Sequence, residues 1–268
     1  MLSNEERLQT RAVREGDYVL LHIDSRRKHL VRVRKGAQVN SDKGVVRHDD
    51  IIRKDWGDTV TLSTGAKAYI LKPTFYDLLM NLPRRVTQVI YPKDIALMII
   101  MSGIGSGSKV LEGGVGSGFL TAALAHYVGS GGHVYCYEIR KEFATIAKQN
   151  LKLLGLSDRA TIKVGDVRKD VTETDLDAAF LDIPDPWNAI DSLAKALKPS
   201  APALIFVPTV NQVIKVVKAL QEHKIGTDIH IYESILREYQ PKPEALRPHT
   251  LITGHTGYIV FFKLVKRS

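Results

Sequence analysis

The sequence has almost no cysteine and no long apolar run, and both shortages limit what the protein can be. Cys136 is the single cysteine among 268 residues, so the chain cannot form an internal disulfide. No Cys or His residues stand at metal-binding spacing, and no apolar stretch reaches the roughly 20 residues of a membrane span. The first residues, MLSNEERLQTR, are charged, unlike a signal peptide. We therefore expect a cytoplasmic protein with no metal centre and no membrane segment.

Acidic residues are the minority charge. The chain has 29 Asp and Glu against 38 Lys and Arg, which gives a formal net charge of +9. An apolar share of 44% and a charged share of 25% are ordinary for a folded soluble domain. A positive surplus of this size favours a polyanionic partner, although a merely basic soluble protein would have the same balance.

Residues 1–75 are expected to form a small β-rich, barrel-like domain. Short apolar stretches such as YVLLHI and KAYIL are separated by glycines, and HLVRVR alternates apolar with basic residues. This segment holds 15 Lys and Arg against 10 Asp and Glu, so it carries +5 of the net +9. Its densest basic group is Arg26, Arg27 and Lys28. We interpret this group as an RNA-binding surface, and a solvated strand face is the alternative.

A glycine-rich stretch, VLEGGVGSGFL at 110–120, is the strongest single signal in the chain. It joins an apolar strand to an apolar helix, and its glycines allow a sharp turn that a ligand can approach closely. No Lys follows the glycines, which excludes the phosphate-binding loop, and Phe119 stands where a dinucleotide fingerprint needs glycine. The stretch fits the E-x-G-x-G-x-G turn with which class I methyltransferases hold the amino-acid part of S-adenosylmethionine (SAM). A glycine-rich hairpin is the alternative.

Strands and helices alternate along residues 76–268, which predicts an α/β domain around a mostly parallel sheet. Four acids, Glu112, Glu138, Asp166 and Asp182, close four consecutive predicted strands. Because ligands bind at the carboxyl ends of parallel strands, these acids are expected to meet at one site. The fold class is therefore a Rossmann-like, class I SAM-dependent methyltransferase domain behind a small N-terminal β domain.

The chemistry of these acids suits an adenosine ligand. Glu138 can accept hydrogen bonds from both ribose hydroxyls, and Asp166 can accept one from the adenine amino group, or else cap a helix. Asp182 opens the segment DIPDPW, in which two prolines stiffen the loop. Trp187 offers a flat face for stacking on a nucleobase, although a core position is nearly as common for tryptophan.

The chain resembles the SAM-dependent tRNA (adenine-N1)-methyltransferases of the TrmI family. The matching stretches are QVIYPKD, VLEGGVGSGFLT, YEIR, LDIPDPW, VPTVNQV and GHTGY, which occur in this order between 88 and 258. The resemblance implies methyl transfer to N1 of adenine 58 in the T-loop of tRNA, and archaeal members also act on adenine 57. It implies a homotetramer as well.

The residues expected at the site follow from the turn, the strand ends and the resemblance. The cofactor-binding residues are Gln88, Glu112, Gly114, Val115, Gly116, Ser117, Gly118, Glu138, Asp166 and Asp182. Asp182 is the expected catalytic residue, because a carboxylate that accepts from adenine N6–H stabilises the positive charge that develops on the ring. Tyr91 is expected to wall the pocket by stacking. The substrate-binding residues are Trp187, Arg26, Arg27, Lys28, His249 and His255.

Two other functions remain open from the residues. A protein-isoaspartate O-methyltransferase has a similar glycine-rich turn, but it needs neither an acid-Pro-Trp loop nor a basic N-terminal domain. A non-catalytic RNA-binding subunit tends to lose the SAM-binding residues, whereas this chain keeps Gly114, Gly116, Gly118, Glu138 and Asp182.

Overall fold

A computed structural model describes residues 12–81 and 85–265. The chain divides into two compact units, 1–82 and 83–268, so the boundary lies later than the predicted one at 75/76. The difference is helix α2 (Phe75–Met80), which begins at a capping box between Thr74 and Asp77 and continues directly from the last strand of the first unit. The charged segment at the start of the chain lies outside the described residues.

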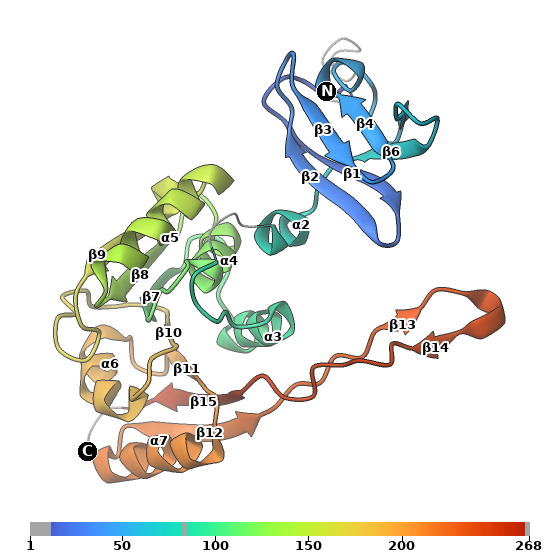
Figure 1. Ribbon diagram of the computed structural model, residues 1–268. Coiled ribbons are helices and arrows are strands. Elements are labelled where there is room, and N and C mark those ends of the chain that lie inside the picture. Colours follow the sequence, from blue (N-terminus) through green and yellow to red (C-terminus); the bar gives the residue numbers. More distant parts are fainter. Residues whose placement is uncertain (1–11, 82–84, 266–268) are drawn as a thin grey trace, which may run out of the picture. The chain divides into compact units, whose positions relative to one another are not determined.

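The N-terminal unit is built from antiparallel strands, as its alternating pattern predicts. Its four-stranded sheet has the order β2-β1-β6-β5, and β3 and β4 form a separate hairpin (Figure 1). The strands are β1 (Tyr18–Asp24), β2 (Arg27–Arg32), β3 (Gln38–Ser41), β4 (Gly44–Arg47), β5 (Thr59–Thr61) and β6 (Lys67–Leu71), and a short 3-10 helix, η1 (His48–Asp50), follows β4. The unit has its own apolar core, in which Val19, Leu21, Ile51 and Ile70 are buried.

The C-terminal unit is organised around one seven-stranded sheet with the order β12-β15-β11-β10-β7-β8-β9. Strands β7 to β11 run parallel, whereas β15 runs antiparallel to both of its neighbours. The strands are β7 (Lys109–Gly113), β8 (His133–Glu138), β9 (Ala160–Val164), β10 (Ala178–Leu181), β11 (Pro202–Val207), β12 (Gly226–Tyr232) and β15 (Tyr258–Leu264). This arrangement confirms the predicted Rossmann-like α/β class.

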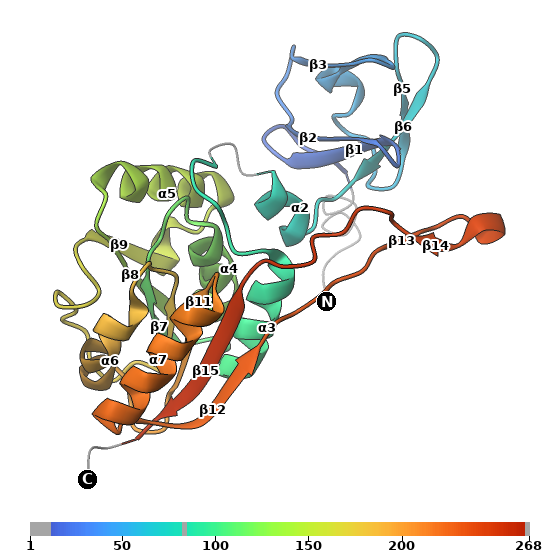
Figure 2. The same ribbon diagram turned by 60° about the horizontal axis from the view of Figure 1, so that its bottom comes forward.

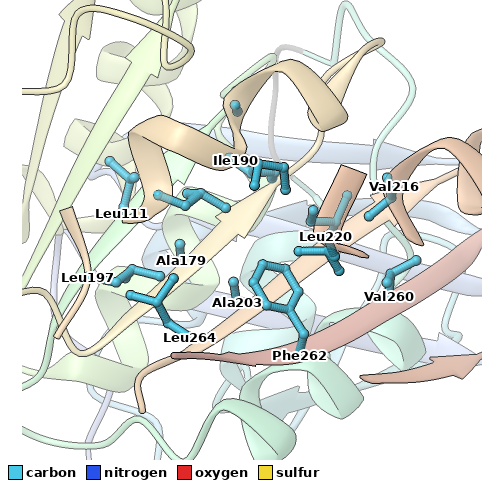
Figure 3. Packing of buried hydrophobic residues seen from close by; sticks show 14 of the residues in the cluster. Leu111, Ala179, Ile190, Leu197, Ala203, Val216, Leu220, Val260, Phe262 and Leu264 are labelled. Atoms are coloured by element: carbon cyan, nitrogen blue, oxygen red, sulfur yellow. The ribbon is translucent and has the colours of Figure 1, made fainter. Parts of the chain in front are cut away.

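Helices cover both faces of this sheet (Figure 2). Helix α4 contacts both α3 and α5 in one layer, and α6 and α7 contact each other in another. The elements are α3 (Pro92–Ser102), α4 (Phe119–Val128), α5 (Lys141–Leu154), η2 (Ser157–Arg159), η3 (Pro186–Ala189), α6 (Ile190–Ala196) and α7 (Val210–His223). Figure 3 shows the apolar core beneath α6 and α7, where Leu220 lies near Phe262. Burial of these side chains stabilises the sheet that carries the site.

Residues 233–257 form a long two-stranded arm beyond the paired ends of β12 and β15 (Figures 1 and 2). The last β12–β15 pair joins Tyr232 to Ile259, and the arm carries β13 (Tyr239–Gln240), η4 (Pro243–Ala245) and β14 (Arg247–Pro248). The sequence predicts only a proline-rich loop over 237–257, because two-residue strands leave no alternating pattern to read.

The structure offers neither a membrane span nor a metal cluster in residues 12–81 and 85–265. No helix in these ranges combines the length and the apolarity that crossing a bilayer requires. Nor do three or more His, Cys, Asp or Glu side chains gather there as metal ligands would.

Candidate functional site

A pocket of about 960 Å³ lies at the carboxyl ends of the parallel strands, within the C-terminal unit. Parallel strands present their loops on one edge of a sheet, which is why the turns after β7, β8, β9 and β10 all reach it. Its lining comprises residues 86–90, 114–117, 119–120, 137–140, 143, 165–168, 182–185, 208 and 212. The pocket therefore gathers Gln88, Gly114, Val115, Gly116, Ser117, Glu138, Asp166 and Asp182 from the predicted set.

The turn after β7 requires glycine at two positions, because atoms of Asp182 and Thr87 occupy the space that a Cβ would need. Gly114 and Gly116 adopt left-handed φ values of +84° and +53°. A Cβ on Gly114 would lie 2.1 Å from the carbonyl oxygen of Asp182, and one on Gly116 would lie 2.8 Å from Thr87 Oγ1. The glycines thus permit packing against β10 as well as access for a ligand.

The segment before α3 is tied to this turn by Ser117. Its hydroxyl oxygen accepts from the backbone N–H of Val86 at 3.0 Å and of Thr87 at 3.3 Å, and its own N–H donates to Thr87 Oγ1 at 3.2 Å. The buried Asn150 of α5 donates from Nδ2 to the Ser117 carbonyl at 2.9 Å. These bonds bring Gln88 to the pocket wall. The sequence reading missed Thr87 and Asn150, because such long-range partners leave no local pattern.

Glu138 holds the turn from the next strand. Its Oε2 accepts from the backbone N–H groups of Val115 at 3.1 Å and Gly116 at 3.0 Å, and its Oε1 accepts from the N–H of Arg140 at 3.0 Å. The side chain is almost fully buried at the end of β8. A carboxylate with charge-assisted bonds is therefore fixed in the pocket wall.

Asp182 follows β10 directly and lines the same pocket as Glu138. Burial, and to a lesser extent the negative charge of Glu138, raise the pKa of Asp182 to about 6. Two carboxylates thus share the pocket, and the half-exposed Arg140 guanidinium, whose Nε lies 3.5 Å from Glu138 Oε1, offsets only part of their negative charge. We refer to Glu138 and Asp182 as the acidic pair. A cationic ligand would relieve their repulsion.

Asp166 is held by an arginine that sequence reasoning did not single out. Arg168 donates to the Asp166 carboxylate from Nε at 2.8 Å and Nη2 at 2.7 Å, and from Nη1 to Asp185 at 2.5 Å. The side-chain hydrogen bonds from Arg168 hold the pKa of Asp166 below its usual value. The carboxylate keeps further lone pairs, so an amino group can still donate to it. The sequence does hint at this role of Arg168, because the residue stands two positions after Asp166, which follows the end of β9.

The prediction that Glu112 lines the cofactor site is wrong. Glu112 lies inside β7, where its Cα pairs with Cys136 on β8 and with Phe180 on β10, and its side chain is fully buried. It is not part of the pocket lining. The Cys136 thiol donates to Glu112 Oε2 at 3.2 Å, and burial raises the pKa of Glu112 to about 8. Glu112 is consequently a neutral core acid at pH 7 and not a strand-end ligand.

Three other predicted residues lie outside the pocket lining. Gly118 is the N-cap of α4, with a φ of +77°, and it packs against Ala147. Trp187 packs against the core under α6 and α7, and Lys215 Nζ lies 4.6 Å from its ring centroid. Trp187 is only partly buried by this packing, so its stacking on a base stays a prediction. Tyr91 is the exposed N-cap of α3, next to the lining residue Ile90.

The remaining predicted residues are spread over both units. Arg27 donates to Asp42 and Asp24, whereas the side chains of its neighbours Arg26 and Lys28 are exposed. His249 is exposed in the arm. His255, at the base of the arm, bonds to the Glu233 carboxylate and to the Pro208 carbonyl.

Glu112 gives the C-terminal unit a testable pH dependence. Its pKa in the folded protein is about 8, above the ordinary 4.5, so between these values the folded state keeps a proton that the unfolded state has lost. The free energy of unfolding should therefore fall by about 1.4 kcal/mol per pH unit as pH rises through this window. Glu112→Gln cannot ionise and should gain stability relative to the parent between pH 5 and 8.

Urea unfolding at pH 5, 6.5 and 8 measures this difference, with Glu142→Gln as a matched substitution at an exposed position. An advantage of Glu112→Gln that does not grow with pH would show that Glu112 is already ionised in the folded protein.

Comparison with known proteins agrees with the geometry of the pocket. Residues 67–247 match the family model described as tRNA methyltransferase complex GCD14 subunit, and residues 12–60 match the TrmI-like N-terminal model. The chain is 36% identical to the tRNA (adenine(57)-N(1)/adenine(58)-N(1))-methyltransferase TrmI of Methanocaldococcus jannaschii, over 90% of this chain and 93% of that protein. It is 29% identical to the tRNA (adenine(58)-N(1))-methyltransferase TrmI of Thermus thermophilus, over 93% of this chain and 98% of that protein.

Solved structures of methyltransferases share the fold of this chain. The tRNA (m1A58) methyltransferase TrmI from Aquifex aeolicus superposes with a TM-score of 0.84 at 29% identity, over 96% of this chain and 100% of that one. A structure described as a SAM-dependent O-methyltransferase from Thermotoga maritima has a TM-score of 0.90 at 40% identity, over 97% of each chain. The fold is that of a class I SAM-dependent methyltransferase, and the chain belongs to the tRNA methyltransferase family of GCD14 and TrmI.

Proposed function

We propose that this protein transfers a methyl group from SAM to N1 of adenine 58 in the T-loop of tRNA. The observation that carries the proposal is the acidic pair in the pocket, with Asp182 at the end of β10 and its pKa raised to about 6. The TrmI relative from Thermus thermophilus is named for adenine 58, and the one from Methanocaldococcus jannaschii for adenines 57 and 58. Adenine 57 is therefore a second candidate position for this chain.

The pocket fits SAM in shape and charge. Gly114 and Gly116 of the turn at 114–117 line the pocket without side chains, so a ligand can approach their backbone. The acidic pair favours a cation, and SAM supplies its methyl group from a positively charged sulfonium. We propose that Glu138 accepts from the ribose hydroxyls, that Asp166 accepts from the adenine amino group, and that Gln88 and residues 114–117 hold the rest.

The cofactor proposal predicts an effect of Glu138→Gln on SAM affinity. This change keeps an oxygen for the backbone donors of Val115 and Gly116 but removes the charge. Losing a charge-assisted bond should weaken SAM binding by about 1.5–3 kcal/mol. Calorimetry on both forms measures this, with the exposed Asp175→Asn as a control that removes one negative charge elsewhere. Equal SAM affinity in the parent and Glu138→Gln would contradict the assignment.

Asp182 is the residue that we place in the catalytic step. Adenine N1 carries a lone pair and no proton, so no base is needed before attack. A carboxylate that accepts from N6–H orients the base, and its hydrogen bond strengthens as positive charge develops on the ring. The raised pKa means that Asp182 carries this charge only above about pH 6.

Substitution of Asp182 should therefore slow methyl transfer without loosening the tRNA. Asp182→Asn keeps an acceptor oxygen but no charge, and we expect single-turnover methylation of tRNA to slow by about 10²-fold or more, with Asp182→Ala slower still. Because phosphate contacts dominate affinity, tRNA binding should change little. The parent rate should fall as pH drops through 6. A near-normal rate for Asp182→Asn would make Asp182 structural, and an equal loss of tRNA binding would make it a recognition residue.

We also propose that the N-terminal unit grips tRNA phosphates through Arg26 and Lys28. Both side chains are exposed, whereas the charge of Arg27 is balanced by Asp24 and Asp42, whose hydrogen bonds raise the pKa of its guanidinium. The double change Arg26→Ala with Lys28→Ala should lower the salt dependence of tRNA binding by about 0.7–0.9 in slope per lost contact. Filter binding across salt concentrations measures the slope. An unchanged slope with SAM binding intact would leave this group as a solvated face.

The homotetramer expected from the resemblance is supported by the arm. Leu236 is 68% exposed and Leu251 91% exposed, and Ile235 and Leu246 are exposed beside them, which is costly for a lone chain. We propose that these side chains contact other copies of the chain. Sedimentation equilibrium should give the tetramer mass, and Leu236→Asp with Leu251→Asp should lower it. A monomer mass for the parent protein would contradict the proposal.

An O-methyltransferase is the second candidate function, because the Thermotoga maritima structure is described as one. Transfer to isoaspartyl peptide, assayed beside transfer to tRNA with the same labelled SAM, separates the two. A non-catalytic subunit is less compatible with a pocket in which the glycine turn, Glu138 and Asp182 are all brought together.

A further inference from the structure

A buried ion pair outside the pocket joins three parts of the C-terminal unit. Asp94 is fully buried, and the side chain of Lys93 is only 10% exposed. Asp94 accepts from Lys93 Nζ at 2.9 Å, from Ser234 Oγ at 2.7 Å and from Thr256 Oγ1 at 2.8 Å. Lys93 Nζ in turn donates to the Ser234 carbonyl and to Thr256 Oγ1, each at 2.7 Å. We call these four residues the arm clamp.

The arm clamp holds the two strands of the arm together at its root, just beyond the last β12–β15 backbone pair. The β12–β15 ladder ends at Tyr232 and Ile259, and Ser234 and Thr256 lie just beyond it on the two opposite strands. Both strands are held by the first turn of α3, whose helix starts at Pro92. Every ammonium proton of Lys93 has an acceptor, so the pair is compensated despite its burial.

The arm root is linked to the pocket in two ways, through the chain that leads into α3 and through a hydrogen bond of His255. The helix that carries Lys93 and Asp94 follows directly on residues 86–90, which line the pocket and are tied to the glycine turn by Ser117. On the other side, His255 donates to the carbonyl of Pro208, another lining residue, at 2.9 Å, while its second ring nitrogen faces Glu233 at 2.6 Å. The position of the arm root is therefore fixed by the same backbone that forms the pocket wall.

We infer that Lys93 and Asp94 are positioning residues for the methyl transfer, which fix the root of the arm beside the lining residue Pro208 by holding Ser234 and Thr256. They are not among the pocket-lining residues, so they act through the arm root. This inference rests on the proposed function, because the reaction that they support is methylation of tRNA. It assigns a role to two matching stretches, YPKD and GHT, that the pocket itself does not explain.

The test separates positioning from stability by removing the ion pair in two ways. Asp94→Leu alone leaves Lys93 buried without its partner and should lower the melting temperature. Lys93→Met with Asp94→Leu removes both charges, so stability should return toward that of the parent, but Ser234 and Thr256 lose their partners. Ser234→Ala with Thr256→Val keeps the ion pair and removes only the hydroxyls of the arm. Lys198→Met, which breaks the surface pair with Asp177, is the control.

In both double variants we expect SAM affinity close to that of the parent, faster amide hydrogen exchange in residues 233–257, and a kcat/KM for tRNA lowered by about ten-fold or more. If Lys93→Met with Asp94→Leu does not fold, the hydroxyl variant decides alone. Methylation within about two-fold of the parent, or unchanged exchange in the arm, would overturn the inference. A parent protein that methylates no tRNA would instead contradict the proposed function, and the exchange in the arm would still show whether the clamp exists.

Discussion

The pairing of β7 with β10 is the constraint on which the site depends. Gly113 lies opposite Leu181, and the N–H of Asp182 donates to the Gly113 carbonyl at 2.9 Å. This register places the carboxylate of Asp182 beside the turn and leaves no space for a side chain on Gly114. Next to β7, the Gly114 N–H donates to the Tyr137 carbonyl, which places Glu138 on the other side of the same turn. One set of backbone bonds thus fixes the glycine turn and both members of the acidic pair.

The acidic pair places two carboxylates near each other, and a bound cation would reduce the repulsion between them. Partial burial and the nearby charge of Glu138 raise the pKa of Asp182, while Glu138 is held by three backbone N–H groups and paired with Arg140. Groups with shifted pKa values gather at functional sites, which fits the proposal that this pocket accepts a cationic ligand.

Much of the fold and of the pocket could be predicted from the sequence, because their signals are local. The strand–turn–helix around 110–120, the helix stopped by Gly155 and the acids at 138, 166 and 182 all follow from short patterns. Glu112 was misplaced because a single acid before a glycine turn does not reveal whether the strand has already ended. The role of Trp187 does not follow from the sequence, because tryptophan serves both stacking and core packing. Asn150 and the arm clamp depend on partners distant in the chain, which one sequence does not show, whereas Arg168 stands only two residues after its partner Asp166.

Methylation of N1 of an adenine in the T-loop of tRNA can be measured on the protein itself. The protein is incubated with methyl-labelled SAM and a tRNA mixture, the RNA is digested with nucleases, and the labelled nucleotide is mapped. We expect the label to appear as 1-methyladenine at position 58, alone or together with position 57. Label in another nucleotide, in a ribose hydroxyl or in protein carboxyl groups would contradict the proposed function.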